Sequence, residues 1–284
     1  MALHGVRVTS ASIGLSARRT YDEVAGRSRQ GIVTGGELVL LAYDSLRAAA
    51  EDIVTRKFSW QEFLLQAWFM VRVSLLPTIL VAIPFGVIVS VQIGGIASQI
   101  GATSFIGAVN GIGVLRQGAP LVTSLMIAGA VGSAITADLG ARQVREEIDA
   151  MKVMGLSPVR RLGAPRIVAA IVVAALLSLV VATTAIVTGF ALVVGSGTVS
   201  SGTYLGAFIS FGQPTDLALA EIKAVLFGFI ATVVAAHKGL NASGGPKGVA
   251  DAVNQSVVLS VILLAVVNVG LTQAYVMLVP QRVA

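Results

Sequence analysis

Two long stretches of the chain contain no charged residue, and they limit what the chain can fold into. No Asp, Glu, Lys or Arg occurs in residues 73–115 or in residues 167–215. At about 1.5 Å per helical residue, residues 73–115 are too long for one crossing of a hydrocarbon core roughly 30 Å thick. The whole chain is 12% charged, about half the fraction of a soluble domain. The sequence therefore predicts a polytopic membrane protein.

Charged residues and Gly-rich segments divide the chain into five expected spans. The Gly-rich residues 94–101 mark the end of the first, and residues 195–206 and 239–248 are an expected outer loop and a turn. Pro120 suits the first turn of the second span, and residues 103–117 are expected to form a short lead-in on the outer side. The spans are placed at about 75–96, 119–138, 167–194, 217–236 and 253–278.

The N-terminal region differs in character from the spans. Residues 1–36 are basic and lack the apolar segment of a signal peptide, so they are expected to form a flexible cytoplasmic tail. Both Trp residues, Trp60 and Trp68, lie near cations in the amphipathic region that follows. This pattern is typical of a membrane–water interface and predicts an interfacial amphipathic helix at residues 58–72. The alternative is a solvated helix that packs on the bundle.

Lys and Arg are distributed very unequally among the connecting segments. Seventeen of the 20 lie before Val73 or in residues 138–166 and 237–253, and one, Arg282, lies in the opposite segments. This positive-inside bias predicts an all-α protein of the inner (plasma) membrane with an interfacial helix and five transmembrane helices. It also places the N-terminus in the cytoplasm and the C-terminus outside. Because the net charge of +6 follows loops rather than one face, nucleic acid is not an expected partner.

The connection between the second and third spans, residues 138–166, is the most charged internal segment. An apolar stripe at positions 144, 148 and 151, with i,i+4 ion pairs on the polar face, predicts an amphipathic helix at residues 142–154. Gly155 and Pro158 end it. Such a short helix cannot bury its stripe alone and needs either the membrane surface or a protein groove, and docking of a helix in a groove is a standard solution. The alternative is a solvated connector whose charges only set the topology.

Three charged residues fall within or beside the spans: Arg116, Glu221 and Lys223. An ionisable group in a span usually faces a cavity or a partner rather than lipid. The alternative is that each side chain extends to the headgroups. Glu221 and Lys223 are two residues apart on a helix, so they are expected to point to different sides.

Catalytic patterns are missing from the sequence. There is no GxxxxGK[ST] and no HExxH, there is no Cys, and the two histidines are far apart. The chain is therefore not expected to be an enzyme, to bind a metal or to hydrolyse a nucleotide.

Several segments occur in a characteristic order along the chain: Gly118-Ala119-Pro120-Leu121, Ala128 to Gly140, Glu146 to Met151, Met154-Gly155, Pro165-Arg166, Glu221-Ile222-Lys223 and Lys238-Gly239. Together they resemble the MlaE/YrbE permease family of ABC lipid transporters that work with MCE proteins. The resemblance covers about residues 58–278. Residues 58–63 and 253–258 are most similar to A-type YrbE subunits of actinobacterial Mce systems.

The resemblance implies a set of partners. These are a second permease subunit of the B-type YrbE kind, a cytoplasmic ABC ATPase dimer that binds ATP and Mg, MCE proteins on the outer face, and a lipid substrate. No cofactor is implied for this chain itself. The helix at residues 142–154 would be the coupling helix. Its expected ATPase contacts are Arg142, Arg145, Glu146, Glu147, Asp149 and Met151.

The sequence departs from the wider family at two places. It has Arg116-Gln117-Gly118-Ala119-Pro120 where many relatives have Arg-Glu-Leu-Gly-Pro, and Ala128-Gly129-Ala130 where they have Ala-Gly-Arg. The loss of these charges implies a different substrate environment, or a non-identical partner that retains them. The candidate substrate-cavity residues are Arg116, Gln117, Glu221 and Lys223.

Other functions remain open at this stage. An ATP-independent secondary transporter or channel would need ion-coupling residues and usually an internal repeat, and no convincing repeat is visible. A structural scaffold of a cell-envelope complex is a third possibility. The apolar lining does not identify the lipid. The resemblance favours import of a lipid, fatty acid or sterol.

Overall fold

The computed structural model describes residues 10–56 and 58–278, and every regular element in them is helical. Five helical segments are long and apolar enough to cross a membrane, judged by length and composition. The predicted class, an all-helical protein with five spans and an additional N-terminal helix, is confirmed. The five segments are α2 (Trp60–Gln99), Thr103–Val144, Val159–Gly195, α9 (Pro214–Leu240) and α10 (Gly245–Leu278).

Two of the spans are built from several joined helices, and three further helices lie outside the spans. The third span consists of the π-helical turn η4 (Val159–Gly163) and α7 (Ala164–Gly195). Outside the spans are α1 (Ser10–Val54), α6 (Glu147–Val153) and α8 (Ser201–Phe211). The second span consists of η1 (Thr103–Phe105), α3 (Ile106–Gly113), η2 (Val114–Gly118), α4 (Ala119–Met126), η3 (Ile127–Val131) and α5 (Gly132–Val144), where η2 and η3 are π-helical turns.

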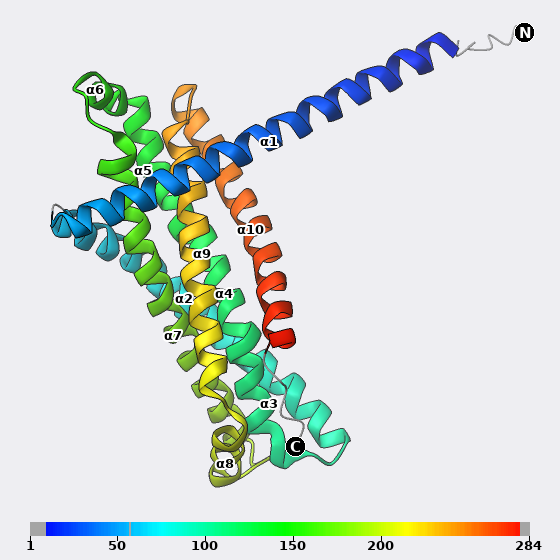
Figure 1. Ribbon diagram of the computed structural model, residues 1–284. Coiled ribbons are helices and arrows are strands. Elements are labelled where there is room, and N and C mark those ends of the chain that lie inside the picture. The colour runs from blue at the N-terminus through cyan, green and yellow to red at the C-terminus, as the bar shows by residue number, and fades with distance from the viewer. Residues whose placement is uncertain (1–9, 57, 279–284) are drawn as a thin grey trace, which may run out of the picture.

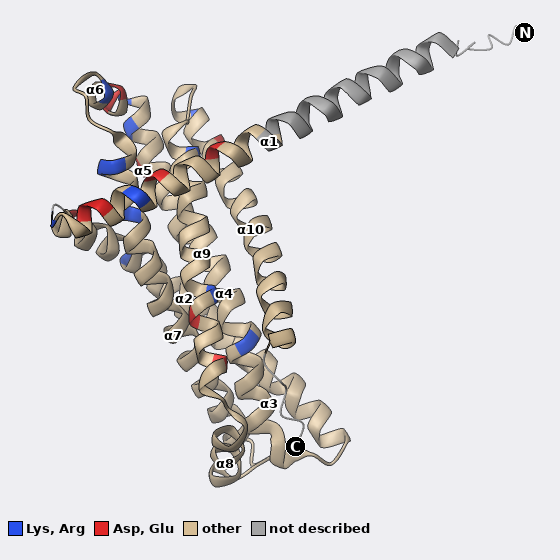
Figure 2. Cartoon of the chain, in the orientation of Figure 1, with Lys and Arg blue, Asp and Glu red and all other residues tan. Residues whose placement is uncertain are grey.

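The spans form an elongated bundle with two different ends (Figure 1). We call the end that carries α1, α6 and the α9–α10 turn the α6 end, and the opposite end, which carries α8, the α8 end. Figure 2 shows that charged residues gather at the α6 end, whereas few lie in the lower part of the bundle. The bundle is therefore strongly asymmetric in charge along its long axis.

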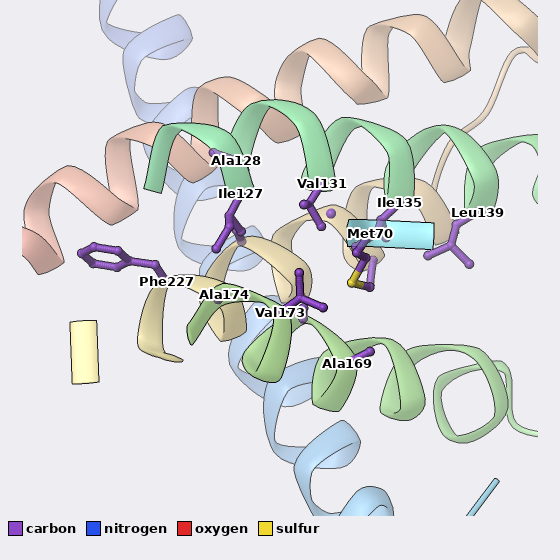
Figure 3. Packing of buried hydrophobic residues seen from close by; sticks show 14 of the residues in the cluster. Met70, Ile127, Ala128, Val131, Ile135, Leu139, Ala169, Val173, Ala174 and Phe227 are labelled. Atoms are coloured by element: carbon purple, nitrogen blue, oxygen red, sulfur yellow. The ribbon is translucent and has the colours of Figure 1, made fainter. Parts of the chain in front are cut away.

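The main core lies where α2, α5, α7 and α9 meet. Small side chains such as Ala128, Ala170 and Ala174 let the helices approach closely, and larger ones such as Phe227 fill the remaining space (Figure 3). Thr136 of α5 ties α10 into this arrangement, because its hydroxyl lies 3.0 Å from the Oγ of Ser256. The core thus fixes four spans, with α10 attached along one side.

The first span is longer than predicted. The expected interfacial helix at residues 58–72 and the expected span at residues 75–96 form one continuous helix, α2, rather than two elements. Arg72 adds a charge but is no helix terminator, and Pro77 and Pro84 are accommodated inside the helix. The helix ends just before Gly101, whose positive φ of 69° makes the turn.

The second span also begins earlier than predicted. Residues 103–117 are not a separate lead-in, because helix runs from Thr103 through Pro120 into α5. Pro120 lies just after the π-helical turn η2, which joins α3 to α4. The expected outer loop at residues 195–206 includes the start of α8, which Ser200 caps by accepting a hydrogen bond from the Thr203 N–H.

The N-terminal region is helical from Ser10, where a flexible tail over residues 1–36 was expected. Residues 1–9 of that tail, and Arg282, lie outside the described residues. Helix α1 lies across the α6 end of the bundle (Figure 1), and Ser45 and Ala49 are buried against it. Glu37 of α1 contacts His237 Nε2 of α9 at 3.1 Å. An amphipathic helix gains its stability from such packing rather than from its intrinsic propensity.

The close approach of α2 and α7 gives a testable prediction. A Cβ at Gly86 would lie 2.5 Å from the carbonyl oxygen of Ala185 on α7. We expect Gly86→Leu to lower the free energy of unfolding by about 1–3 kcal/mol, because overpacking forces the backbones apart. Chemical denaturation in detergent micelles measures this change. Gly95→Leu on the same helix is the control, since no atom lies within 4 Å of a Cβ there. Equal losses of unfolding free energy in both variants would show that overpacking between α2 and α7 is not the cause.

Candidate functional site

A buried ion pair joins the second and fourth spans. The Nε of Arg116, in η2, lies 2.6 Å from Oδ1 of Asp216, in the first turn of α9. The Asp216 side chain is 0% exposed and that of Arg116 is 23% exposed. Asp216 also closes a capping box with Gln213, and a carboxylate in this position interacts favourably with the helix dipole. The pair therefore fixes the start of α9 against η2.

Lys223 lies two turns further along α9 and is fully buried. Its Nζ donates to the main-chain carbonyl of Arg116 at 3.0 Å and to Oγ1 of Thr272 on α10 at 2.7 Å. The π-helical geometry of η2 is of the kind that recurs at functional sites. The ammonium group is thus held by oxygen atoms of two other spans.

Tyr275 of α10 completes the arrangement. Its hydroxyl donates to Oδ1 of Asp216 at 2.9 Å, and the Arg116 guanidinium lies 5.4 Å from the centre of its ring. We call these five residues the Arg116–Lys223 cluster: Arg116, Asp216, Lys223, Thr272 and Tyr275. It combines two cationic side chains with one carboxylate inside the bundle.

The structure brings together three of the four predicted substrate-cavity residues. Arg116 and Lys223 belong to the cluster, and the exposed Gln117 reaches Thr272 at 3.4 Å. Glu221 does not join them, because it lies on another side of α9 beside Ser178 of α7. Its Oε1 is buried and has no hydrogen-bond partner among the described residues. Glu221 and Lys223 thus point to different sides of α9, as predicted.

Sequence reasoning missed Asp216, Thr272 and Tyr275. Asp216 directly follows the charge-free residues 167–215 and directly precedes the predicted fourth span at residues 217–236. The seven-residue spacing of Asp216 and Lys223 places both on one face of a helix and could have revealed the pair. Thr272 and Tyr275 are three apart on α10 and share a face in the same way, but which helix they face is a tertiary property.

At the α6 end, the predicted coupling helix is interrupted. Residues 142–154 were expected to form one helix, but α5 ends at Val144 and α6 begins at Glu147. Between them Glu146 has a φ of 59°, the left-handed region that a non-Gly residue rarely adopts. Gly155 makes the turn after α6 with a φ of 74°. Arg142 consequently belongs to the end of α5, whereas the other predicted contacts flank or lie on α6.

The apolar stripe of this segment is largely covered by the chain itself. Ile148 is 1% exposed and belongs to the main core, and Met151 packs against that core. For Ile148 and Met151 the expectation that the stripe needs a partner to bury it is therefore incorrect, because the ends of the spans provide the groove. Val144, the third member of the stripe, is 39% exposed, and Val153, 89% exposed, and Met154 are also exposed.

The charges of α6 remain at the surface. Arg145 donates to Glu147 at 2.7 Å, and Lys152 donates to Asp149 at 2.8 Å. These hydrogen bonds hold the pKa of each carboxyl group below its ordinary value. Both carboxylates are therefore ionised at neutral pH, and they lose this interaction only when the pH falls through their lowered pKa.

A groove of about 790 Å³ lies beside α6. Its walls come from the α1–α2 connection, α6 and the start of the third span, and they mix acidic, basic and apolar side chains. Asp52 and Arg160, which form an ion pair between α1 and η4, lie at this groove. The lining residues include Phe58, Glu62, Arg142, Met151, Leu156, Arg161 and Pro165.

Comparisons with known proteins agree with this architecture. A probable ABC transporter permease protein of Rickettsia bellii is 30% identical over 178 residues, covering 63% of this chain and 69% of the relative. Another, from Synechocystis, is 30% identical over 193 residues, covering 64% and 70%. The Arabidopsis thaliana protein TRIGALACTOSYLDIACYLGLYCEROL 1, chloroplastic, is 29% identical over 210 residues, covering 74% and 60%.

The match to a family extends over most of the chain. Residues 63–274 match the family described as Permease MlaE. This range covers most of each of the five spans, all of α6, and every residue of the Arg116–Lys223 cluster except Tyr275. The chain therefore belongs to the MlaE permease family and is a multi-pass membrane permease of the ABC transporter type.

Proposed function

We propose that this chain is the permease subunit of an ATP-driven lipid transporter of the inner (plasma) membrane. A second permease subunit, of the B-type YrbE kind, forms the lipid pathway with it. A cytoplasmic ABC ATPase dimer supplies energy, and MCE proteins receive or deliver lipid on the outer face. The direction proposed is import of a lipid, fatty acid or sterol. Family membership supports the permease role.

The observation that carries this proposal is the surface of α6. This helix stands at the cation-rich end of the bundle, which in the proposal faces the cytoplasm. It is anchored on one side by Ile148 and presents exposed charges and Val153 on the other. A short, anchored helix with a mixed charged and apolar outer face suits docking to the groove of an ATPase.

Three other observations support a lipid pathway shared with a second permease. The cluster of two cationic side chains and one carboxylate has a surplus of positive charge, which suits a lipid with an anionic headgroup. One relative is named after a galactolipid, trigalactosyldiacylglycerol. Helix α10 also presents a row of large apolar side chains to its surroundings, interrupted at the exposed Gln273: Val258, Ile262, Val266, Val269 and Met277.

The ATPase contact is tested by charge reversal. We expect the double variant Glu146→Lys/Glu147→Lys to lose most ATPase during affinity purification of the assembled transporter, because both exposed carboxylates would become cationic. Loss of one charged contact at a desolvated interface costs roughly 2–5 kcal/mol. The measurement is the ratio of ATPase to permease in the purified complex.

A matched control separates docking from general charge effects. Asp251→Lys changes an exposed carboxylate at the same end, on α10 rather than α6, and is expected to leave the ratio unchanged. If the α6 double variant retains the full amount of ATPase, the docking surface is not α6. If the permease never purifies with an ATPase and moves lipid alone in proteoliposomes, the ATP-driven function itself is refuted.

A further inference from the structure

Arg166, at the start of α7, is a buried cation that joins three spans. Its side chain is 1% exposed. Its Nη2 donates to the carboxylate of Asp138 on α5, and its Nε donates to Oε1 of Gln66 on α2 at 3.1 Å. Gln66 in turn donates to Glu62 at 2.7 Å. One guanidinium group therefore links α2, α5 and α7 at the α6 end.

This arrangement is an inefficient way to stabilise a bundle. The Nη1 of Arg166 is buried and has no hydrogen-bond partner among the described residues, which carries a desolvation cost. Replacing a buried ion pair by uncharged groups of similar volume is often neutral or stabilising. The network therefore calls for an explanation other than stability.

Asp138 connects this buried network to the surface. Its carboxylate also contacts the Nε of Arg142, one turn further along α5, at 3.4 Å. Nη1 of Arg142 lies 4.0 Å from Glu147, in the first turn of α6. The four residues Arg166, Asp138, Arg142 and Glu147 thus form a series of alternating charges that leads from the bundle interior to α6. We call it the ion-pair series.

The helix is interrupted between α5 and α6, so the ion-pair series can connect α6 to the spans where the helical backbone does not. The left-handed Glu146 separates the two helices, so α6 is not a rigid extension of α5. Three kinds of side-chain contact link α6 to the spans: the apolar packing of Ile148 and Met151, the hydrogen bond that Gln143 of α5 donates to Asp149 at 3.3 Å, and the ion-pair series. A displacement of α6 changes the contact between Glu147 and Arg142. Because Arg142 and Arg166 both contact the Asp138 carboxylate, this change also alters the interaction between Asp138 and Arg166.

We propose that Asp138 and Arg166 are positioning residues that transmit movement of α6 to α2 and α7. This inference rests on the proposed function, in which α6 receives the movement from the ATPase. Asp138 is the shared group, because it contacts one arginine that leads to α6 and one that leads to the other spans. Neither residue needs to contact ATPase or lipid for this role.

The test is the double variant Asp138→Asn/Arg166→Gln in the complete transporter, reconstituted in proteoliposomes. Removing both charges avoids an uncompensated buried ion, so the variant is expected to fold and assemble. ATP hydrolysis and lipid movement are measured separately. Coupling between sites is commonly worth 5–150-fold, and we expect the lipid moved per ATP to fall by roughly that factor while hydrolysis and ATPase content persist.

The control is the corresponding pair Asp52→Asn/Arg160→Gln, which removes an ion pair between α1 and η4 at the same end. It is expected to leave the lipid moved per ATP unchanged. An unchanged ratio in the Asp138/Arg166 variant overturns the inference, and so does an equal fall in the control. Wild-type complex that lacks an ATPase, or lipid movement without ATP, refutes the proposed function instead, so the two failures are distinguishable.

Discussion

Asp216→Ala is expected to lower the free energy of unfolding by roughly 3 kcal/mol, because it removes the buried carboxylate that pairs with the partly buried guanidinium of Arg116. Arg116 loses its 2.6 Å ion pair, and the Tyr275 hydroxyl loses an acceptor at 2.9 Å. The first turn of α9 also loses its capping box. Chemical denaturation in detergent micelles, followed by Trp fluorescence, measures the change.

Asp251→Ala is the matched control for this substitution. It removes the same side chain from an exposed position on α10, where changes are usually within about 0.5 kcal/mol. A loss below 1 kcal/mol for Asp216→Ala would show that the cluster relaxes without its carboxylate. Asp216→Asn should fall between the two, because an amide oxygen can still accept the Tyr275 hydrogen bond.

Phe227→Ala is expected to have an effect of similar size for a different reason. The ring is fully buried in the main core (Figure 3), and its truncation leaves a cavity that close-packed helices cannot fill. Such changes typically cost about 3–5 kcal/mol. The same denaturation experiment measures it.

Phe69→Ala is the control, because it makes the same substitution at a position where no buried cavity results. Phe69 is 38% exposed on α2, so the same group is removed from a surface where detergent or lipid can replace it. We expect a cost well below that of Phe227→Ala. Similar costs at both positions would mean that the core is less tightly packed around Phe227 than the helix contacts suggest.

The number of spans could be predicted from the sequence because charge placement is a local property. A stretch such as residues 167–194 has no charged residue that would end a span. Helix ends were less predictable, since a change from amphipathic to apolar character at Arg72 does not interrupt a helix. The π-helical turns likewise left no signal that distinguishes a joined span from a lead-in followed by a span.

The candidate sites were predictable as residues but not as contacts. Arg116 and Lys223 stand out because charges are rare in spans, whereas Asp216 stood at a boundary and Thr272 and Tyr275 are ordinary polar residues. Ile148 shows the converse case. Its periodicity correctly identified an apolar face, but only the arrangement of the other spans determines that this face is covered within the same chain.

The position of Tyr275 on α10 has a consequence for biosynthesis. Asp216 and Lys223 lie on α9, which is synthesised before α10, so the two charged residues reach the membrane before Thr272 and Tyr275 exist. Arg116 has already been made and can hold Asp216 in the meantime. The contacts of α9 are therefore incomplete until α10 has been inserted. In a chain that ends after α9, the buried ammonium group of Lys223 would lack Thr272, one of its two oxygen partners.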